Sequence, residues 1–246
     1  MFHLAALTHI GRSKFEPIKY LEVNGLATGN ILDACRNENV EKFIYTSTSH
    51  VYGNPLQERI NEFHPTQPLS IYAASKLAGE AAVYGYLYSY GIHTTIARLS
   101  NLYGSSFSTD TVIGLAVDQV VNNRPVELKS LTSIRDFIYV TDAVDSLIRL
   151  AEVDHNRSES EVVNVSTGKG VSVAEMAVTL VEEAEKLGLD RVQIMEPHEE
   201  VIEKIPSLVL DNSRLISLTG WSPLVNLHNG LRLTISHRLE LDRGHK

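Results

Sequence analysis

The sequence has little cysteine, little tryptophan and no long apolar run. Cys35 is the single cysteine among 246 residues, which excludes a disulfide within the chain and is typical of a protein of the reducing cytoplasm. No apolar segment approaches the roughly 20 residues that a membrane span needs. The first residues, MFHLAALTHIG, lack the basic start and cleavage pattern of a signal peptide. We therefore expect a cytoplasmic protein without membrane contact.

Basic residues are also too sparse to form a cluster. The chain has 22 Lys and Arg against 30 Asp and Glu, a formal net charge of -8, and no short window rich in basic residues, so nucleic acid is not an expected partner. His3, His9, His50 and His64 lack the spacing of metal ligands, and we expect no metal site. What is present is an ordinary globular composition, with 43% hydrophobic and 21% charged residues.

Helical and strand patterns alternate along the chain, which predicts an α/β fold with a doubly wound, mostly parallel sheet and ligands at the strand carboxyl ends. Thr141 is the expected cap of one helix and Ser172, with Glu175, of another. Helices are predicted at 17–36, 72–90, 111–123, 141–153, 172–188, 211–221 and 227–241. Strands are predicted at 42–47, 93–100, 136–140, 161–166 and 191–195.

A tyrosine and a lysine stand four residues apart in the segment YAASK, so Tyr72 and Lys76 share one face of the expected helix. A lysine ammonium near a phenol lowers the phenol pKa and gives a base able to take a proton from a sugar or alcohol hydroxyl. The pair follows a strand that ends in the hydroxyl residues 46–49. Alone, this spacing is weakly specific, and a solvated helix pair beside a turn cluster is the alternative interpretation.

Eight short segments extend this pattern in order along nearly the whole chain. They read FHLAA, VNGLATGN, KFIYTSTSHVYG, SIYAASKLAGE, ARLSNLYG, RDFIYVTD, NVSTGKGVSV and LTGWSP. In their order and spacing the sequence resembles the extended short-chain dehydrogenase/reductase family, specifically its NAD-dependent nucleotide-sugar epimerase and dehydratase branch. The resemblance implies a Rossmann-like sheet with a small C-terminal substrate-binding lobe, NAD as cofactor and a nucleotide-sugar as substrate.

The resemblance also implies roles for individual residues. Thr48, Tyr72 and Lys76 would form a catalytic triad, with Tyr72 as acid/base and Lys76 binding the nicotinamide ribose and lowering the tyrosine pKa. The positions that match cofactor-lining residues are Ala5, Ala6, Asn24, Thr46, Ser47, Tyr72, Lys76 and Ser100. Those that match the substrate side are Thr48, Ser49, His50, Asn101 and Arg135. A guanidinium binds phosphate bidentately, so Arg135 suits a diphosphate; a surface ion pair with Asp136 is the alternative.

The Gly-rich start of this family has no counterpart in the sequence. The family opens with a strand, a Gly-rich turn and a helix whose N-terminus binds the pyrophosphate, whereas no Gly-x-x-Gly-x-x-Gly precedes residue 3. We expect an N-terminally truncated sheet that binds NAD weakly or not at all. Three explanations of the truncation are open: a start site placed too late, a deliberately shortened chain, or a natural remnant of the family. Residues 1–150 would form a partial NAD-binding domain, and 151–246 mainly the substrate-binding lobe with a strand and helix returning to the core.

The two residues after the triad threonine bear on the reaction. The family's dehydratases have Asp and Glu there and its decarboxylases Ser and Glu, whereas this chain has Ser49 and His50. Serine does not replace a carboxylic acid in dehydration, so a 4-epimerase, which needs only reversible hydride transfer and rotation of the keto intermediate, is the simplest interpretation. His50 as a base is an alternative to a hydrogen-bonding or exposed residue. Decarboxylase, reductase and dehydratase are the alternatives among enzymes.

Two functions from different classes therefore remain open. The first is an NAD-dependent nucleotide-sugar 4-epimerase, and the second is a non-catalytic family remnant that acts as a binding or assembly module. The helices at 17–36 and 72–90 match those that pair across the family's dimer interface, so the resemblance also predicts a homodimer.

Overall fold

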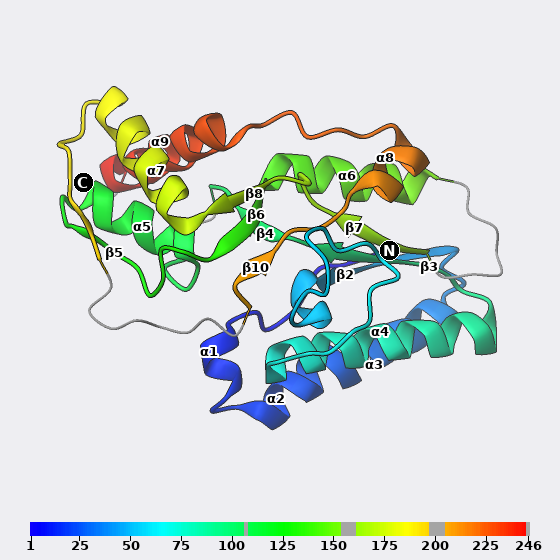
Figure 1. Cartoon of the computed structure of the whole chain (residues 1–246). Coiled ribbons are helices and arrows are strands. Elements are labelled where there is room, and N and C mark those ends of the chain that lie inside the picture. The colour runs from blue at the N-terminus through cyan, green and yellow to red at the C-terminus, as the bar shows by residue number, and fades with distance from the viewer. Residues whose placement is uncertain (106–107, 154–160, 197–204, 245–246) are drawn as a thin grey trace.

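The computed structural model describes residues 1–105, 108–153, 161–196 and 205–244, and it confirms a parallel, doubly wound sheet (Figure 1). The main sheet has the strand order β1-β2-β3-β7, with all neighbours parallel. Residues on both faces of β2 and β3 are buried, as expected for strands covered by helices on two sides. These strands span Phe2–His3, Lys42–Thr48, His93–Leu99 and Glu161–Val165.

Helices cover both faces of this sheet (Figure 1). On one face, α3 (Ala27–Asn37) and α4 (Ile71–Tyr90) pack against Phe43 and Tyr45 of β2. On the other face, α6 (Val140–Glu152) and α8 (Ser213–Thr219) pack over Ile44. Consecutive strand residues point to opposite faces, which is why one short apolar strand contributes to two separate cores.

The predicted helix at 72–90 is confirmed, including both of its ends. Ser70 caps the first turn through a hydrogen bond from the Ala73 amide at 3.1 Å, and Gly91 ends the helix in the left-handed conformation at φ +71°. The alternating tyrosines near its end, which look strand-like, are helical. The Ser172–Glu175 capping box is also confirmed, at the start of α7 (Val173–Lys186). The serine cap and the glycine stop therefore predict this helix better than the strand-like alternation of its tyrosines does.

The predicted helix at 17–36 is confirmed in extent, but it is not a regular α-helix throughout. After α1 (Ile10–Ser13), α2 covers only Pro17–Leu21, and a π-helical turn over Glu22–Leu26 leads into α3. Such turns insert one extra residue into a helix and are frequent at functional sites. Here the turn contains Asn24 and Gly25, both buried, and a Cβ on Gly25 would lie 3.3 Å from the Ala78 Cβ of α4. The turn therefore lies in close contact with α4.

The predicted Thr141 cap is wrong. Helix α6 begins at Val140, directly after strand β6, so Thr141 already lies inside the first turn. The buried Asp142 of this turn accepts hydrogen bonds from the backbone N–H groups of Leu224 and Val225, at 3.1 and 2.9 Å. The N-cap position is occupied by Tyr139, the last residue of β6, whose side chain makes no capping hydrogen bond.

A second part of the molecule is built around a smaller sheet with the order β10-β6-β4, to which β8 adds antiparallel to β6. Its core also contains residues of β4 and α5, so it draws on residues before and after position 150. The strands are β4 (Asn101–Tyr103), β6 (Ile134–Tyr139), β8 (Gly170–Ser172) and β10 (Ser207–Leu208), with a separate pair β5 (Val126–Glu127) and β9 (Ile194–Met195). The helices are α5 (Val112–Val121), α7 and α9 (Leu227–Gly244).

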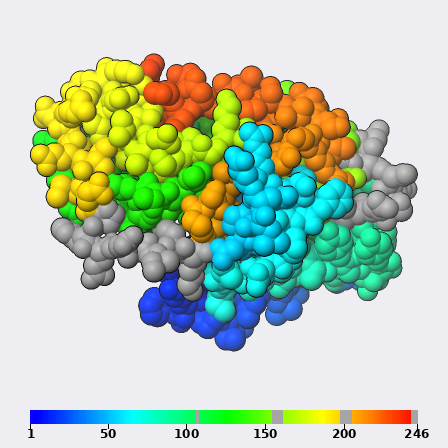
Figure 2. Space-filling model, in the orientation of Figure 1, coloured from blue at the N-terminus to red at the C-terminus, as the bar shows by residue number. Residues whose placement is uncertain are grey.

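The long loop after β2 joins the two parts. Figure 2 shows residues of this loop, in cyan, lying against the orange segment near residue 210 on the front of the molecule. Ile60 forms a parallel bridge with Leu210, and both side chains belong to an apolar cluster with Val51, Tyr52 and Leu208. In the described ranges, no helix combines the length and apolar character that a membrane crossing requires.

Candidate functional site

Several of the expected site residues lie where strand β2 ends and helix α4 begins. Strand β2 ends in Thr48 and continues as a 3-10 turn over Ser49–Tyr52, while Tyr72 and Lys76 lie in the first two turns of α4. Gly79 permits this close approach, since a Cβ there would lie 2.2 Å from the Tyr45 hydroxyl of β2. The helix therefore lies directly against the end of the strand.

Tyr72 lies between a hydroxyl and an imidazole. Burial raises the pKa of the Tyr72 phenol, and a hydrogen bond with Thr48 acts in the opposite direction. The Thr48 hydroxyl also accepts a hydrogen bond from the His50 amide at 3.3 Å, and the His50 ring meets the Tyr72 ring edge-on, with centroids 6.4 Å apart. Three predicted site residues thus form one contact group.

The charge on His50 is suppressed by its surroundings. Burial and, to a smaller extent, the positive charge of Arg135 lower the pKa of His50 to about 4. At neutral pH the imidazole is therefore neutral and able to accept or donate one hydrogen bond. Its neighbour Ser49 is buried in the same 3-10 turn.

Lys76 is buried, with 2% of its surface exposed. Its ammonium lies over the Tyr45 ring, 4.2 Å from the centroid. The pKa of Lys76 is lowered to about 8, because burial outweighs the opposite effect of the Glu80 carboxylate one helical turn away. The sequence-based expectation was a lowered pKa for Tyr72 next to this lysine, whereas in this structure burial dominates and the pKa of Tyr72 is raised.

The expected cofactor-side residues differ in what they contact. Ala5 is exposed and Ala6 half-buried in the loop after β1. The Thr46 hydroxyl donates to the His3 carbonyl at 3.0 Å and ties β2 to β1. Ser47 donates to Glu80 at 2.5 Å. Both hydroxyls thus have protein partners that the sequence did not indicate.

Asn24 holds the loop after β1 in place. Its side-chain amide exchanges two hydrogen bonds with the backbone of Leu7 and donates a third to the Ser75 hydroxyl of α4 at 2.9 Å. The residue is 1% exposed. Its place in the expected site is therefore that of a clamp between the loop, the π-turn and α4.

Ser100, expected on the cofactor side, and Asn101 and Arg135, expected on the substrate side, lie on the path from β3 to β6. The Ser100 hydroxyl donates to Asp136 at 3.4 Å, and Asn101 is half-buried at the start of β4. The Arg135 guanidinium donates to the carbonyls of Ile134 and Pro206, at 2.8 and 3.3 Å. Arg135 thereby connects β6 to the segment before β10 and acts electrostatically on His50.

Asp136 was missed as a structural residue of the site. Its carboxylate accepts hydrogen bonds from the Thr167 amide and hydroxyl and from the Gly168 amide, at 3.0, 2.8 and 2.9 Å. Burial raises the pKa of Asp136 to about 6, against the effect of these hydrogen bonds. The sequence signal was an acidic residue inside an apolar strand, which indicates a buried and paired carboxylate.

Two further residues were missed close to Lys76. Arg98 of β3 and Glu80 of α4 form a buried ion pair, 2.7 Å between Arg98 Nη2 and Glu80 Oε2. The Arg98 guanidinium also lies over the Tyr52 ring, 4.7 Å from the centroid, and the Tyr52 hydroxyl donates to Asn164 at 2.7 Å. An arginine within a buried apolar strand was the available signal, but its partner lies 18 residues away in the chain.

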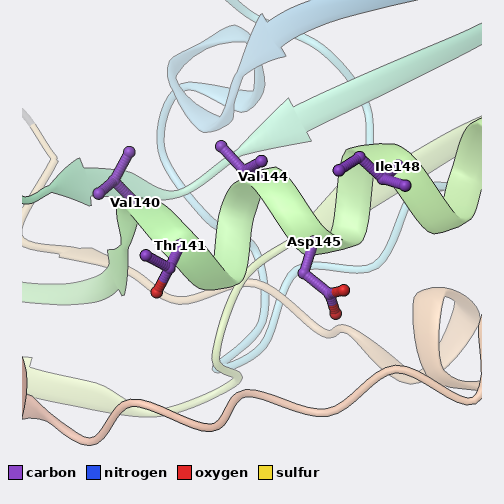
Figure 3. Close-up of a pocket in the computed structure, with 5 residues that line it drawn as sticks. All are labelled: Val140, Thr141, Val144, Asp145 and Ile148. Atoms are coloured by element: carbon purple, nitrogen blue, oxygen red, sulfur yellow. The ribbon is translucent and has the colours of Figure 1, made fainter.

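Other surface features do not coincide with this group. A shallow apolar hollow of about 270 Å³ lies on the outer side of α6 (Figure 3), lined by Val140, Thr141, Val144, Asp145 and Ile148. None of the predicted site residues lines it. Within the described part of the chain, no group of three or more His, Cys, Asp and Glu side chains is arranged to hold a metal ion.

Comparison with known proteins matches this arrangement to one family. The model of the GDP-mannose 4,6 dehydratase family matches residues 1–234. The chain belongs to this family. Its members among the relatives below are nucleotide-sugar epimerases and dehydratases of the extended short-chain dehydrogenase/reductase type, which confirms the resemblance seen in the sequence.

Relatives of this family member carry both activities in their names. A dTDP-D-glucose 4,6-dehydratase of Homo sapiens is 30% identical over 239 residues, which cover 96% of this chain and 67% of the human protein. A putative UDP-glucose 4-epimerase of Methanocaldococcus jannaschii is 31% identical over 242 residues, covering 96% of this chain and 75% of that protein. The chain spans 66% of the length of the bovine dehydratase, about two thirds, as for the human protein.

Solved structures of epimerases share the fold. UDP-glucose 4-epimerase of Thermotoga maritima with UDP-glucose superposes with a TM-score of 0.88 at 26% identity, covering 98% of this chain and 77% of that one. UDP-glucose 4-epimerase of Thermus thermophilus in complex with NAD gives a TM-score of 0.84 at 30% identity, covering 96% and 76%. Nucleotide-sugars and NAD are thus ligands of structural neighbours of this family member.

Proposed function

We propose that this family member is an NAD-dependent 4-epimerase of a nucleotide-sugar. The observation that carries the proposal is the pair Ser49 and His50 in the 3-10 turn beside Tyr72. Dehydration needs an acid and a base beside the keto-sugar. Ser49 is no carboxylic acid, and His50, with its pKa lowered to about 4, carries no acidic proton at neutral pH. Epimerisation needs neither group.

In this proposal Tyr72 is the acid/base. Burial raises the phenol pKa, so Tyr72 rests as the phenol and needs the nearby Lys76 ammonium to act as a base. Tyr72 takes the proton of the C4 hydroxyl and returns it to the C4 oxygen after the sugar has turned, while Thr48 donates a hydrogen bond to the same oxygen. NAD, when bound, supplies reversible acceptance of the hydride from C4.

The residues of this chain fit the nicotinamide half of NAD. The small, exposed Ala5 permits close approach of a ligand to the loop after β1, and Lys76, Tyr72 and Ser100 would hold the nicotinamide ribose side. The pyrophosphate side has no Gly-rich turn in this sequence. We therefore expect weaker NAD binding by residues 1–246 than by the longer relatives, measured as the dissociation constant by isothermal titration calorimetry.

For the substrate, we propose that Asn101 and Arg135 face the diphosphate and that Ser49 and His50 face the sugar. The guanidinium of Arg135 provides several donors in a planar fork, and β6 presents it beside the 205–208 segment, whose Pro206 carbonyl it also binds. We propose residues 1–150 as the cofactor part and 151–246 as mainly the substrate part, with the substrate also contacted by residues of the first part such as Asn101 and Arg135.

The deciding experiment incubates the purified chain with saturating NAD and UDP-glucose and separates the products by chromatography with mass spectrometry. An epimerase yields the C4 epimer, with no change of mass. A product lighter by one water identifies a dehydratase instead. Bound NAD or nucleotide-sugar without turnover, seen as copurifying ligand, would favour the binding or assembly module.

We also propose that the chain forms a homodimer through α2, α3 and α4. Apolar side chains stand exposed on these helices and on the π-turn that joins the first two, among them Ile18, Leu26 and Tyr88, at 65%, 65% and 70% exposure. Burial of such side chains against a second copy removes apolar surface from water.

A further inference from the structure

We propose that Glu80 is a positioning residue for the reaction: its carboxylate, fixed by Arg98 and Ser47, keeps the Lys76 ammonium charged beside Tyr72. The inference rests on the function proposed above. It assigns a role to Glu80, the last residue of the segment SIYAASKLAGE, which is not a member of the expected triad.

Three hydrogen bonds fix the Glu80 carboxylate. Arg98 donates from Nε to Oε1 at 3.1 Å and from Nη2 to Oε2 at 2.7 Å, and Ser47 donates to Oε1 at 2.5 Å. Glu80 is 1% exposed and Arg98 also lies inside the protein. Charge-assisted bidentate bonds of this kind fix geometry as well as charge. The carboxylate therefore has one position relative to α4.

Lys76 precedes Glu80 by four residues, so both side chains lie on one face of α4. The ammonium lies over the Tyr45 ring of β2 and acts electrostatically on His3 of β1, whose own pKa is lowered by burial and by Lys76, while Tyr72 precedes Lys76 by four residues in α4. None of these supplies a negative charge at neutral pH. Glu80 is the acidic group that raises the pKa of Lys76 against the effect of burial.

The opposing effects of burial and Glu80 on Lys76 matter because they place its pKa at about 8, close to neutral pH. A buried ammonium without a nearby carboxylate loses its proton at lower pH, and a neutral Lys76 does not favour the Tyr72 phenolate. The Arg98 fork binds both oxygens of the Glu80 carboxylate, so the negative charge acts on Lys76 from a fixed position.

The test measures the pKa of Lys76 directly in the ligand-free chain. Lysine labelled with carbon-13 at Cε is followed by NMR over pH 6 to 11, and the Lys76 signal is assigned by its loss in Lys76→Arg. Glu80→Gln is expected to lower the pKa of Lys76 by at least about one. Glu80→Asp keeps the charge and is expected to restore at least half of that change.

Two further variants keep the proposal falsifiable. Glu80→Gln leaves Arg98 buried without its partner, so Glu80→Gln/Arg98→Met, which removes both charges, replaces it where the single variant fails to fold. Glu183→Gln removes a buried carboxylate in the second part of the molecule and is expected to leave the Lys76 titration unchanged. An unaltered Lys76 pKa in the Glu80 variants, or an equal change in Glu183→Gln, would overturn the proposal.

Activity gives a second readout that purely structural damage does not produce. The alkaline limb of the pH profile of kcat/KM is expected to move to lower pH in Glu80→Gln by the same amount as the Lys76 titration. A uniform loss at every pH, with no movement of the limb, contradicts the role. If the wild-type chain epimerises no nucleotide-sugar, the proposed function fails, and the NMR titration still decides whether Glu80 sets the charge of Lys76.

Discussion

The side chain of Asn24 pairs with the backbone of Leu7 in both directions. Oδ1 accepts a hydrogen bond from the Leu7 amide at 2.8 Å, and Nδ2 donates to the Leu7 carbonyl at 2.9 Å. Through the further bond to Ser75, one buried amide connects the loop expected beside the cofactor with the helix that carries Tyr72 and Lys76. The position of this loop is therefore coupled to the position of α4.

Asn24→Leu should release this loop. The Leu7 amide and carbonyl lose their partners, which costs about 1–3 kcal/mol for each group that stays buried. We expect a lower melting temperature and at least about fivefold weaker NAD binding, measured by thermal denaturation and isothermal titration calorimetry. Asn37→Leu, at an exposed position of α3, is the control. If Asn24→Leu binds NAD as tightly as the wild type, the loop does not contribute to the cofactor site.

Tyr72→Phe should abolish turnover while NAD stays bound. The substitution removes only the hydroxyl that carries the proton, so epimerisation is expected to fall by at least about 100-fold, the usual scale of acid/base catalysis. Product formation and NAD titration measure the two properties separately. Tyr88→Phe makes the same change on an exposed part of α4 and should be silent. Undiminished activity in Tyr72→Phe would remove Tyr72 from its role.

His50 should contribute more to acid sensitivity than to the rate. Its pKa of about 4 lies below the ordinary 6.5, so the unfolded chain binds more protons and stability falls as the pH falls from 6.5 to 4. The melting temperature of His50→Gln should therefore fall less between pH 6.5 and 4 than that of the wild type. His237→Gln is the control. His50→Ala should change kcat less than tenfold. A larger loss of kcat would make His50 catalytic.

Glu183 should stabilise the second part of the molecule above pH 4.5. Its pKa is lowered to about 2, first by the hydrogen bond from Lys186 and then by Arg232 and His228, so its contribution is lost as the pH falls from 4.5 towards 2. Glu183→Gln should unfold at lower temperature at pH 7 and show a flatter acid limb. The exposed neighbour Glu182→Gln controls for charge. Parallel pH profiles for wild type and Glu183→Gln would contradict this.

Leu26→Glu should convert the proposed dimer into a monomer. The change places a charge in the exposed apolar surface of α2, α3 and α4, and burying an unpaired charge opposes association. Light scattering gives the mass of the wild type and the variant. Leu224→Glu, at an 81% exposed position before α9, should leave the mass unchanged. A monomeric wild type at micromolar concentration would end the dimer proposal.

Sequence reasoning succeeded where the signal is local. The strand ending in Thr48, the helix from Tyr72 to Gly91 and the Ser172–Glu175 box follow from apolar spacing and caps within a few residues. The pairing of Glu80 with Arg98 and the cage around Asp136 join residues 18 to 36 positions apart, and no spacing rule encodes them. The effect of burial on the Tyr72 pKa likewise depends on the whole fold.

The number of residues in the π-turn over Glu22–Leu26 also determines how α2 is rotated relative to α3. Each helical residue advances the side-chain direction by about 100°, so the extra residue gives α2 and α3 different angular phases although the chain passes between them without a break. Ile18 of α2 and Leu32 of α3 therefore do not belong to one continuous apolar face of a single helix. Deleting one residue from this turn would rotate α2 by about a quarter turn and carry Asn24 away from Leu7, whereas many side-chain changes on the outer face would leave that phase intact.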